Sequence, residues 1–343
     1  MTSGVGMDQT ETTVMEALPS PVKYKRRWGR RLLKTILIVF LVLLLALTGL
    51  AWYGSTRVTR IPSDELTALS PYEGGPRNIL LVGSDSRENL PKDLEGKVGK
   101  FAGERADVIM IFHVVPGEDL AQLISLPRDL KVDIPGEGTN RINAAYAFGG
   151  PDLLVRTVEK ATGLPIHNYA ELRFGGFAGF VDAVGGVPIN FKYPARDAKS
   201  GLEVDDGNQR LNGFTALALV RSRQYQEKRD GEWVSVKAND LGRAGRQQRV
   251  LTALFSQVKD PATVLELAAI FDAMKDIRVD ESFGFPAMAF TGVRILMIGT
   301  DGLEREVLAV DFSNEGGRSY VVAENPIAAI QLDNFGAGRS IEG

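Results

Sequence analysis

An uninterrupted apolar segment near the N-terminus is the strongest constraint on what this chain can fold into. Residues 35–53 hold no charged side chain, and a helix needs about 20 such residues to cross the hydrocarbon core of a membrane. A basic run precedes the segment, and Trp28 and Trp52 flank it where the two membrane interfaces would lie. The sequence therefore predicts a single transmembrane helix, with a cytoplasmic N-terminus and everything after Tyr53 outside.

A cleaved signal peptide is the alternative interpretation of this segment. Signal peptides have a shorter apolar stretch followed by small residues at the cleavage site. Trp52 and Tyr53 are bulky and stand where that site would be, which favours an uncleaved anchor. We then expect a basic cytoplasmic tail at 1–34, the membrane helix at 35–53, a linker at 54–76, one extracytoplasmic domain at 77–325 and a polar tail at 326–343.

Strand-like and helix-like segments alternate after the linker. Residues 77–83, 107–115 and 121–126 are short apolar runs bounded by turn residues, as buried strands are. Residues 151–163 are typical of a helix, because a proline stands at the start and a glycine at the end. Interleaved strands and helices predict one mixed α/β domain.

The composition excludes several kinds of site. The chain has no cysteine and only two histidines, His113 and His167. Disulfides, thiolate nucleophiles and zinc sites with three imidazoles are therefore impossible. His113 lies within an apolar strand, so we expect a core residue, and we expect His167 to make local hydrogen bonds. The formal net charge of −3 gives no general attraction to nucleic acid, so any anion site must be local.

Charged residues stand at the ends of the predicted strands. Asp85 follows the run 77–83, and Asp107 begins the next strand two residues after Arg105, which puts these two on one face. Two close carboxylates suit Mg²⁺, which takes one or two carboxylates together with phosphate oxygens. Solvated acids are an equally good interpretation of the aspartates alone. Arg128, next to an aspartate, is by itself most simply a member of a surface ion pair.

Arginines are most concentrated between residues 221 and 249. Arg221 and Arg223 are two apart and share a face if their segment is extended, whereas Arg243, Arg246 and Gln247 form one stripe if theirs is a helix. The planar guanidinium donates two parallel hydrogen bonds to phosphate, so convergence of these side chains predicts an anion site. A solvated face is the alternative.

Taken together, these segments resemble the LytR-CpsA-Psr family of cell-envelope glycopolymer phosphotransferases. The matching pieces follow in family order from about residue 77 to residue 256: NILLVGSDSR, RADVIMI, ISLPRDLKV, RINAAYAFGG, FGGFAGFVDAVGGVPI, LNGFTALALVRSR and DLGRAGRQQRVL. Each piece is weak alone, but seven in order are specific. The resemblance implies an α/β/α fold with a mixed central β-sheet flanked by helices, and a long hydrophobic groove for a polyprenyl chain.

The resemblance also implies an activity and its residues. The activity is Mg²⁺-dependent transfer, with Mn²⁺ as an alternative metal, of a glycopolymer from polyprenyl pyrophosphate to a peptidoglycan hydroxyl, which forms a phosphodiester. The implied metal ligands are Asp85 and Asp107. The implied pyrophosphate-binding residues are Arg105, Arg128, Arg221, Arg223, Arg243, Arg246 and Gln247, and the implied catalytic residues are Asp107, Arg105, Arg128 and Arg221. Gln224 departs from the many members that carry histidine there.

Two other functions remain open from the sequence. One is a non-catalytic protein that binds polyprenyl phosphates or an anionic wall polymer, and the other is a pyrophosphatase that acts on the same lipid. For the transferase, the expected partners are a polyprenyl-pyrophosphate-linked glycopolymer, peptidoglycan and the bacterial cell membrane. We do not expect nucleic acid as a partner, because the arginines lie outside the cell in this topology and the sequence shows no aromatic stacking platform.

Overall fold

The computed structural model describes residues 48–49, 52–84, 105–118, 120–236, 240–258, 273–299, 302–315 and 317–341. The described residues from Trp52 onward belong to one unit. The predicted membrane helix at 35–53 lies almost entirely outside the described residues. Among the residues that are described, no helix is long and apolar enough to cross a membrane.

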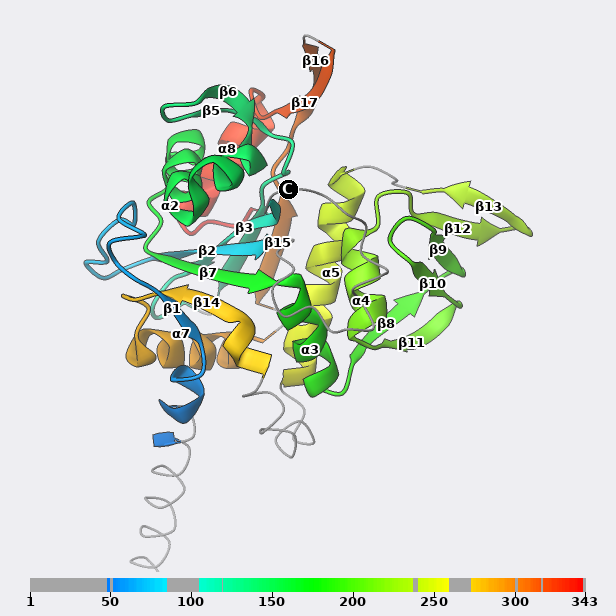
Figure 1. Ribbon diagram of the computed structural model, residues 1–343, viewed down its shortest axis with the longest axis horizontal. Coiled ribbons are helices and arrows are strands. Elements are labelled where there is room, and N and C mark those ends of the chain that lie inside the picture. The colour runs from blue at the N-terminus through cyan, green and yellow to red at the C-terminus, as the bar shows by residue number, and fades with distance from the viewer. Residues whose placement is uncertain are drawn as a thin grey trace, which may run out of the picture. The chain divides into compact units, whose positions relative to one another are not determined.

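A seven-stranded mixed sheet forms the centre of this unit (Figure 1). Its strands, in spatial order, are β1 (Thr59–Ile61), β14 (Ile277–Asp280), β7 (Asn168–Arg173), β2 (Arg77–Ser84), β3 (Ala106–Val114), β4 (Ala121–Ser125) and β15 (Leu303–Val307). β2 runs parallel to β7 and antiparallel to β3, and β4 runs antiparallel to β3 and parallel to β15. Helices cover the sheet, so the predicted mixed α/β fold with flanking helices is confirmed.

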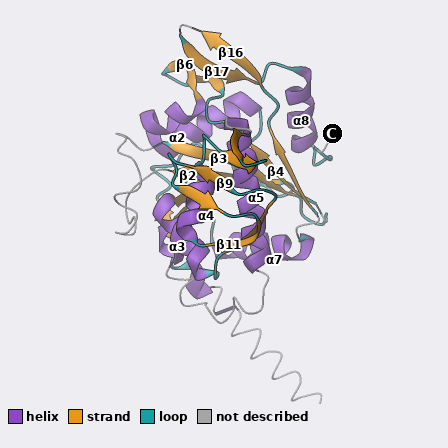
Figure 2. Ribbon diagram, turned by 90° about the vertical axis from the view of Figure 1, so that its right-hand side faces the viewer, coloured by secondary structure: helices purple, strands orange, loops and turns teal. Residues whose placement is uncertain are grey.

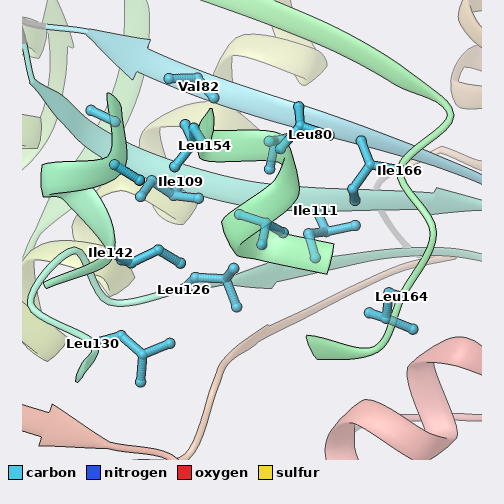
Figure 3. Packing of buried hydrophobic residues seen from close by; sticks show 14 of the residues in the cluster. Leu80, Val82, Ile109, Ile111, Leu126, Leu130, Ile142, Leu154, Leu164 and Ile166 are labelled. Atoms are coloured by element: carbon cyan, nitrogen blue, oxygen red, sulfur yellow. The ribbon is translucent and has the colours of Figure 1, made fainter. Parts of the chain in front are cut away.

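One face of the sheet packs against α2 (Ile142–Thr162) and α8 (Pro326–Gly336), which lie above the central strands in Figure 1. Side chains of a strand alternate between its two faces, and one alternate set from β2 and β3 enters this core. Figure 3 shows members of that set with a leucine of α2: Leu80, Val82, Ile109, Ile111 and Leu154.

The other alternate set faces a second core. Ile79 of β2 and Met110 of β3 pack there with Leu251 of α5 (Asp240–Val258) and Met288 of α7 (Phe285–Ile298). Because both faces of the strands are covered, the apolar runs in the sequence are continuous rather than alternating.

Both ends of the predicted domain differ from expectation. Within the segment 54–76, expected to be a linker, β1 pairs in parallel with β14 and Leu66 is buried. Within 326–343, expected to be a polar tail, α8 buries Ala328 and Phe335, which are seven residues apart and therefore on one helix face. Neither a three-residue strand nor a helix with two buried residues can be recognised from composition alone.

The predicted helix at 151–163 is the second half of α2. Gly149 and Gly150 have non-helical backbone angles, and Pro151 follows them at the start of a new helical run. The run ends at Gly163, whose φ of 72° is left-handed and whose N–H donates to the Glu159 carbonyl.

A second group of elements packs around its own core beside the main sheet, and Figure 2 views the molecule from this side. It contains α3 (Phe174–Ala183), α4 (Gly213–Arg221), α5, the hairpin of β8 (Val187–Phe191) and β11 (Gly207–Leu211), and the sheet of β10 (Leu202–Val204), β9 (Ala195–Asp197), β12 (Gln226–Arg229) and β13 (Glu232–Ser235). Further described elements are the hairpins β5 (Lys131–Ile134) with β6 (Gly138–Arg141) and β16 (Asp311–Glu315) with β17 (Arg318–Val322), and a 3₁₀ turn, η2 (Met274–Asp276).

The close approach of α3 and α4 depends on Gly213. A Cβ at Gly213 would lie 2.1 Å from the backbone oxygen of Ala178. The Gly213 N–H donates to the Asp182 carboxylate at 2.7 Å, and the Asn212 side chain accepts from the Thr215 N–H at 2.9 Å, which caps the helix. These contacts fix the start of α4 and thereby the position of the residues at its end.

We expect Gly213→Ala to lower the free energy of unfolding by about 1–3 kcal/mol, because the new methyl group must push α3 away from α4. Urea unfolding of the purified protein measures this. Gly179→Ala in α3 is the matched control, since no neighbouring atom lies within 4 Å of its Cβ position, and it should be neutral or stabilising. Equal effects of the two substitutions would contradict this packing.

Candidate active site

Four strands bring polar residues to one end of the central sheet. β2 and β7 run parallel, and Ser84 pairs with Arg173 where both strands finish. β3 is antiparallel to β2, so it starts at this end, and Asp107 is its second residue. β4 runs parallel to β2, and the chain continues from Ser125 past the same end to Arg128. Residues far apart in sequence therefore meet at one edge.

A β-bulge places Asp107. Gly83 pairs with Val108 and Ser84 pairs with Ala106, so Asp107 is an extra residue without a partner in β2. A bulge interrupts the alternation of side chains and re-aims the residue that it contains. Because of this bulge, strand alternation does not place Asp107 on the same face as Arg105, as the sequence pattern had predicted.

An ion pair joins Asp107 to Arg128. Arg128 Nη1 lies 2.5 Å from Asp107 Oδ1, and the side chains are 11% and 21% exposed, respectively. Arg128 Nε also lies 3.6 Å from Asp129. Arg128 is thus largely buried rather than part of a surface pair, and attraction between these charges is stronger than in bulk water. Arg105 lies just before β3 and is exposed, and Asp85 lies outside the described residues.

Arg221 and Arg223 occupy the end of α4 and the turn that follows. Arg221 is the last residue of the helix, and its guanidinium lies 5.3 Å from the centre of the Phe174 ring. Ser222 is the C-cap with extended backbone angles, and Arg223 follows it. The condition for a shared face, an extended segment, is not met, because the capped helix continues through Arg221.

A buried carboxylate, Asp197, holds this turn. Its Oδ2 accepts hydrogen bonds from the Ser222 hydroxyl at 2.7 Å and from the N–H groups of Arg223 and Gln224 at 2.8 and 2.7 Å. Asp197 is 1% exposed. Its burial opposes ionisation, but these hydrogen bonds and those from the backbone of Lys199 and Ser200 outweigh that effect and lower the pKa of Asp197. Asp197 was not among the expected site residues, because its only signal in the sequence is a lone aspartate before a turn.

The predicted stripe on α5 is buried against the same turn. Arg243, Arg246 and Gln247 are only 4%, 8% and 8% exposed, respectively. The alternative of a solvated arginine face is therefore excluded. Arg246 Nη2 donates to the Ser222 carbonyl at 2.6 Å, and Gln247 Nε2 donates to the Val220 carbonyl at 3.2 Å. Burial lowers the pKa of Arg246.

The neighbouring Gln248 connects α5 to the strand ends. Its Nε2 donates to the Ser125 hydroxyl at 2.9 Å and to the Glu306 carbonyl at 2.7 Å. Ser125 ends β4, three residues before Arg128. Therefore α5 links the end of β4 on one side to the Arg221–Arg223 turn on the other.

An apolar cavity of about 330 Å³ lies beside these polar groups, between the sheet and the helices α3, α4 and α5. The residues that line it include Leu81, Met110, Phe112, Phe174, Phe177 and Leu217. Gly83 and Val108, the pair next to the bulge, and Gln247 of the α5 stripe also line it. Phe174 and Phe177 belong to FGGFAGFVDAVGGVPI, one of the pieces on which the family resemblance rests.

A fully buried glutamate, Glu171, ties the strand ends together. Its carboxylate accepts from the Ser84 hydroxyl at 2.7 Å, from Tyr146 and Tyr169 hydroxyls at 2.9 and 3.2 Å, and from Arg278 at 3.2 Å. A buried carboxylate needs such partners. No local pattern marks Glu171, because Ser84, Tyr146 and Arg278 are distant from it in sequence.

Neither histidine belongs to this site. His113 is buried in β3, its Nδ1 lies 2.7 Å from Asn78 Oδ1, and burial lowers the pKa of His113 to about 4. His167 Nδ1 accepts from the Asn78 N–H at 3.0 Å. The expectations of a core histidine and of local hydrogen bonding are both confirmed. Asn78 lies near the start of β2, at the opposite end from Ser84.

The described residues hold one of the two predicted metal ligands. Asp107 offers a partly exposed carboxylate with one oxygen paired to Arg128, which fits a hard cation that takes few protein ligands. Within the described part of the chain, no three or more His, Cys, Asp or Glu residues are grouped as a metal site.

We expect Asp197→Asn to lower the free energy of unfolding at neutral pH by about 2–3 kcal/mol, because a charged acceptor of several buried hydrogen bonds is lost. The pKa of Asp197 is lowered by folding, so this stabilisation is present above the ordinary carboxyl pKa and is lost as pH falls through the lowered value. The variant should therefore lose less stability on acidification.

Urea unfolding at several pH values measures both effects. Asp205→Asn, an exposed neighbour, is the matched control and should leave the pH profile unchanged. Identical acid profiles for Asp197→Asn and the wild type would show that Asp197 does not hold the turn.

Comparison with known proteins agrees with the resemblance in the sequence. The LytR_cpsA_psr family matches residues 54–333. The "Probable cell wall biosynthesis protein LcpB" of Corynebacterium glutamicum is 37% identical over 247 residues, which are 71% of this chain and 56% of that protein. The Halalkalibacterium halodurans protein named "Polyisoprenyl-teichoic acid--peptidoglycan teichoic acid transferase TagU" is 30% identical over 264 residues, covering 75% of this chain and 77% of that one.

A solved structure shares the fold. The "LytR-Csp2A-Psr enzyme from Actinomyces oris" superposes with a TM-score of 0.63 at 25% identity and covers 82% of this chain and 96% of that one. The chain spans little more than half the length of the corynebacterial relative. The match over residues 54–333 and the shared fold lead to one conclusion: this chain belongs to the LytR-CpsA-Psr family.

Proposed function

We propose that this protein is a cell-envelope phosphotransferase that moves a glycopolymer from a polyprenyl-pyrophosphate carrier to a peptidoglycan hydroxyl, with formation of a phosphodiester. One observation carries the proposal: an apolar cavity of about 330 Å³ is lined by Phe174, whose ring centre lies 5.3 Å from the Arg221 guanidinium, and by Val108, the residue after Asp107 of the Asp107–Arg128 pair. A lipid pyrophosphate has the same two parts, an apolar chain and a dianionic headgroup, so both would be bound at once.

The arginines would hold the two phosphates. Phosphoryl transfer needs the charge on the phosphate oxygens neutralised and the reacting groups held in line. Guanidinium groups do this through paired hydrogen bonds. The residues that we propose for this role are Arg105, Arg128, Arg221, Arg223, Arg243, Arg246 and Gln247. Arg246 and Gln247 would also act by holding the carbonyls on either side of Arg221.

Asp85 and Asp107 would hold Mg²⁺, or Mn²⁺ in its place. Bound there, the metal would supply positive charge against the phosphate oxygens. Asp107 is also our candidate for the group that accepts the proton of the incoming hydroxyl. Its carboxylate has one oxygen paired with Arg128, which orients it. Glu171 would position this end of the sheet through Ser84, the residue before Asp85.

The membrane anchor belongs to the same proposal. Residues 35–53 would span the cell membrane once, with residues 1–34 in the cytoplasm and the α/β domain outside, where lipid carrier and peptidoglycan meet. The H. halodurans relative carries the name of a teichoic acid transferase. A lipid-linked teichoic acid is therefore the first donor to test.

We expect Arg128→Ala and Asp107→Asn each to lower the rate of polymer transfer by roughly 10²–10³-fold, as loss of one charge-stabilising group does elsewhere. The assay follows labelled polymer from a lipid-linked donor to peptidoglycan, with Mg²⁺ and with chelator. Arg156→Ala, an exposed arginine on α2, is the matched control and should keep wild-type rates.

Three outcomes would contradict the proposal. Unimpaired transfer by Arg128→Ala would show that the active site is not at Arg128. Release of free polymer phosphate without an acceptor would identify a pyrophosphatase. Tight binding of the donor with no turnover at any metal concentration would identify a binding protein.

We also expect Ala170→Phe to raise the KM for a long polyprenyl donor roughly tenfold, because Ala170 lines the cavity and a phenyl group would exclude about two CH₂ groups, each worth about 0.8 kcal/mol. A donor with a short lipid should be affected much less. Val234→Phe, at an exposed position of β13, is the control. If long and short donors respond equally to Ala170→Phe, the cavity does not hold the lipid.

A further inference from the structure

A second hollow lies on the outer side of α5. It has a volume of about 590 Å³ and is bounded by β8, α5 and β15. Figure 1 shows α5 between the strands of the main sheet and β8. We call it the α5 groove, and its polar lining residues are Asn190, Gln248, Arg249, Thr252, Ser256 and Arg305.

The α5 groove uses a different face of α5 from the apolar cavity. Gln248, Thr252 and Ser256 follow one another at four-residue spacing and line the groove. Gln247 and Leu251, one position earlier on each turn, line the apolar cavity. One helix therefore separates an apolar site from a polar one.

Two guanidinium groups give the α5 groove a positive charge. Arg249 donates to the Asn190 carbonyl and lies 5.3 Å from the centre of the Phe191 ring. Arg305 Nη1 donates to the Thr252 hydroxyl at 2.6 Å. The lining contains no aspartate or glutamate, and within the described residues neither guanidinium is paired with a carboxylate. This is unusual in a chain with 43 acidic and 40 basic residues, in which many other arginines pair with acids.

The α5 groove begins next to the candidate active site. Gln248 lines it, and the same side chain donates to Ser125 and to the Glu306 carbonyl. Gly245, which also lines it, directly precedes the buried Arg246. A chain attached to a phosphate at the active site would therefore reach the groove within a short distance.

We propose that the α5 groove binds an anionic segment of the transferred polymer, with Arg249 and Arg305 paired to its phosphate or carboxylate groups. This rests on the proposed function, since it makes the groove the polymer subsite of the same enzyme. Arginine forks recognise such groups through paired hydrogen bonds. The lining has no aromatic side chain on which a neutral sugar ring would stack, so charge, and not sugar identity, selects the occupant.

A binding experiment on the full chain in detergent micelles tests the proposal. The probes are a labelled soluble oligo(glycerol phosphate) and a neutral dextran of similar length. We expect the wild type to bind the oligo(glycerol phosphate), more weakly as salt rises, and not the dextran. The double variant Arg249→Gln with Arg305→Gln should bind it about tenfold more weakly, a loss of about 1.4 kcal/mol.

The matched control removes two positive charges elsewhere. Arg156→Gln with Lys228→Gln changes exposed residues on α2 and β12 and should bind the oligo(glycerol phosphate) as the wild type does. Thermal unfolding of both double variants checks that they fold. A second measurement compares transfer from a long anionic donor with transfer from a donor that carries only its first sugars, and the ratio should fall in the groove variant alone.

Each remaining outcome decides the matter. Unchanged binding in the groove variant, or an equal loss of binding in the control variant, would overturn the proposal. So would a groove variant that loses binding to soluble peptidoglycan fragments and keeps binding to the polyanion. If the wild type binds the polyanion through Arg249 and Arg305 but transfers nothing, the proposed function fails, and the assignment of a polyanion site stands.

Discussion

Burying arginine next to an apolar cavity is the constraint on which the rest of this structure depends. A guanidinium group removed from water destabilises the fold unless acceptors surround it. The structure meets this need with the Ser222 carbonyl for Arg246 and the Asp107 carboxylate for Arg128. The elements that carry these acceptors, the turn after α4 and the bulge in β3, are therefore held in place by the same contacts that shape the site.

Much of the fold follows from local sequence patterns. The apolar runs at 77–83 and 107–115 are the central strands β2 and β3, and the helix expected at 151–163 ends at Gly163 as predicted. The stripe of Arg243, Arg246 and Gln247 lies on a helix and is buried. These features depend on periodicity within a few residues, which a single sequence displays.

Other features depend on contacts between distant segments. Asp197 and Ser222 are separated by 25 residues, and Glu171 and Arg278 by 107, so nothing local in the sequence marks either carboxylate as a partner. The bulge at Asp107 arises from the register of two strands and cannot be read from one of them. The packing of α8 was missed because its apolar residues form no clear stripe: Ala328 and Phe335 are buried, whereas Ile327 and Ile330 are exposed.

The most direct test of the central claim is a crystal structure of the protein with a polyprenyl pyrophosphate and Mg²⁺. We predict isoprenoid carbons against Phe174 and Met110 within the apolar cavity, and a diphosphate within hydrogen-bonding distance of Arg128 and Arg221. A lipid bound elsewhere, or a diphosphate that contacts neither arginine, would contradict the account.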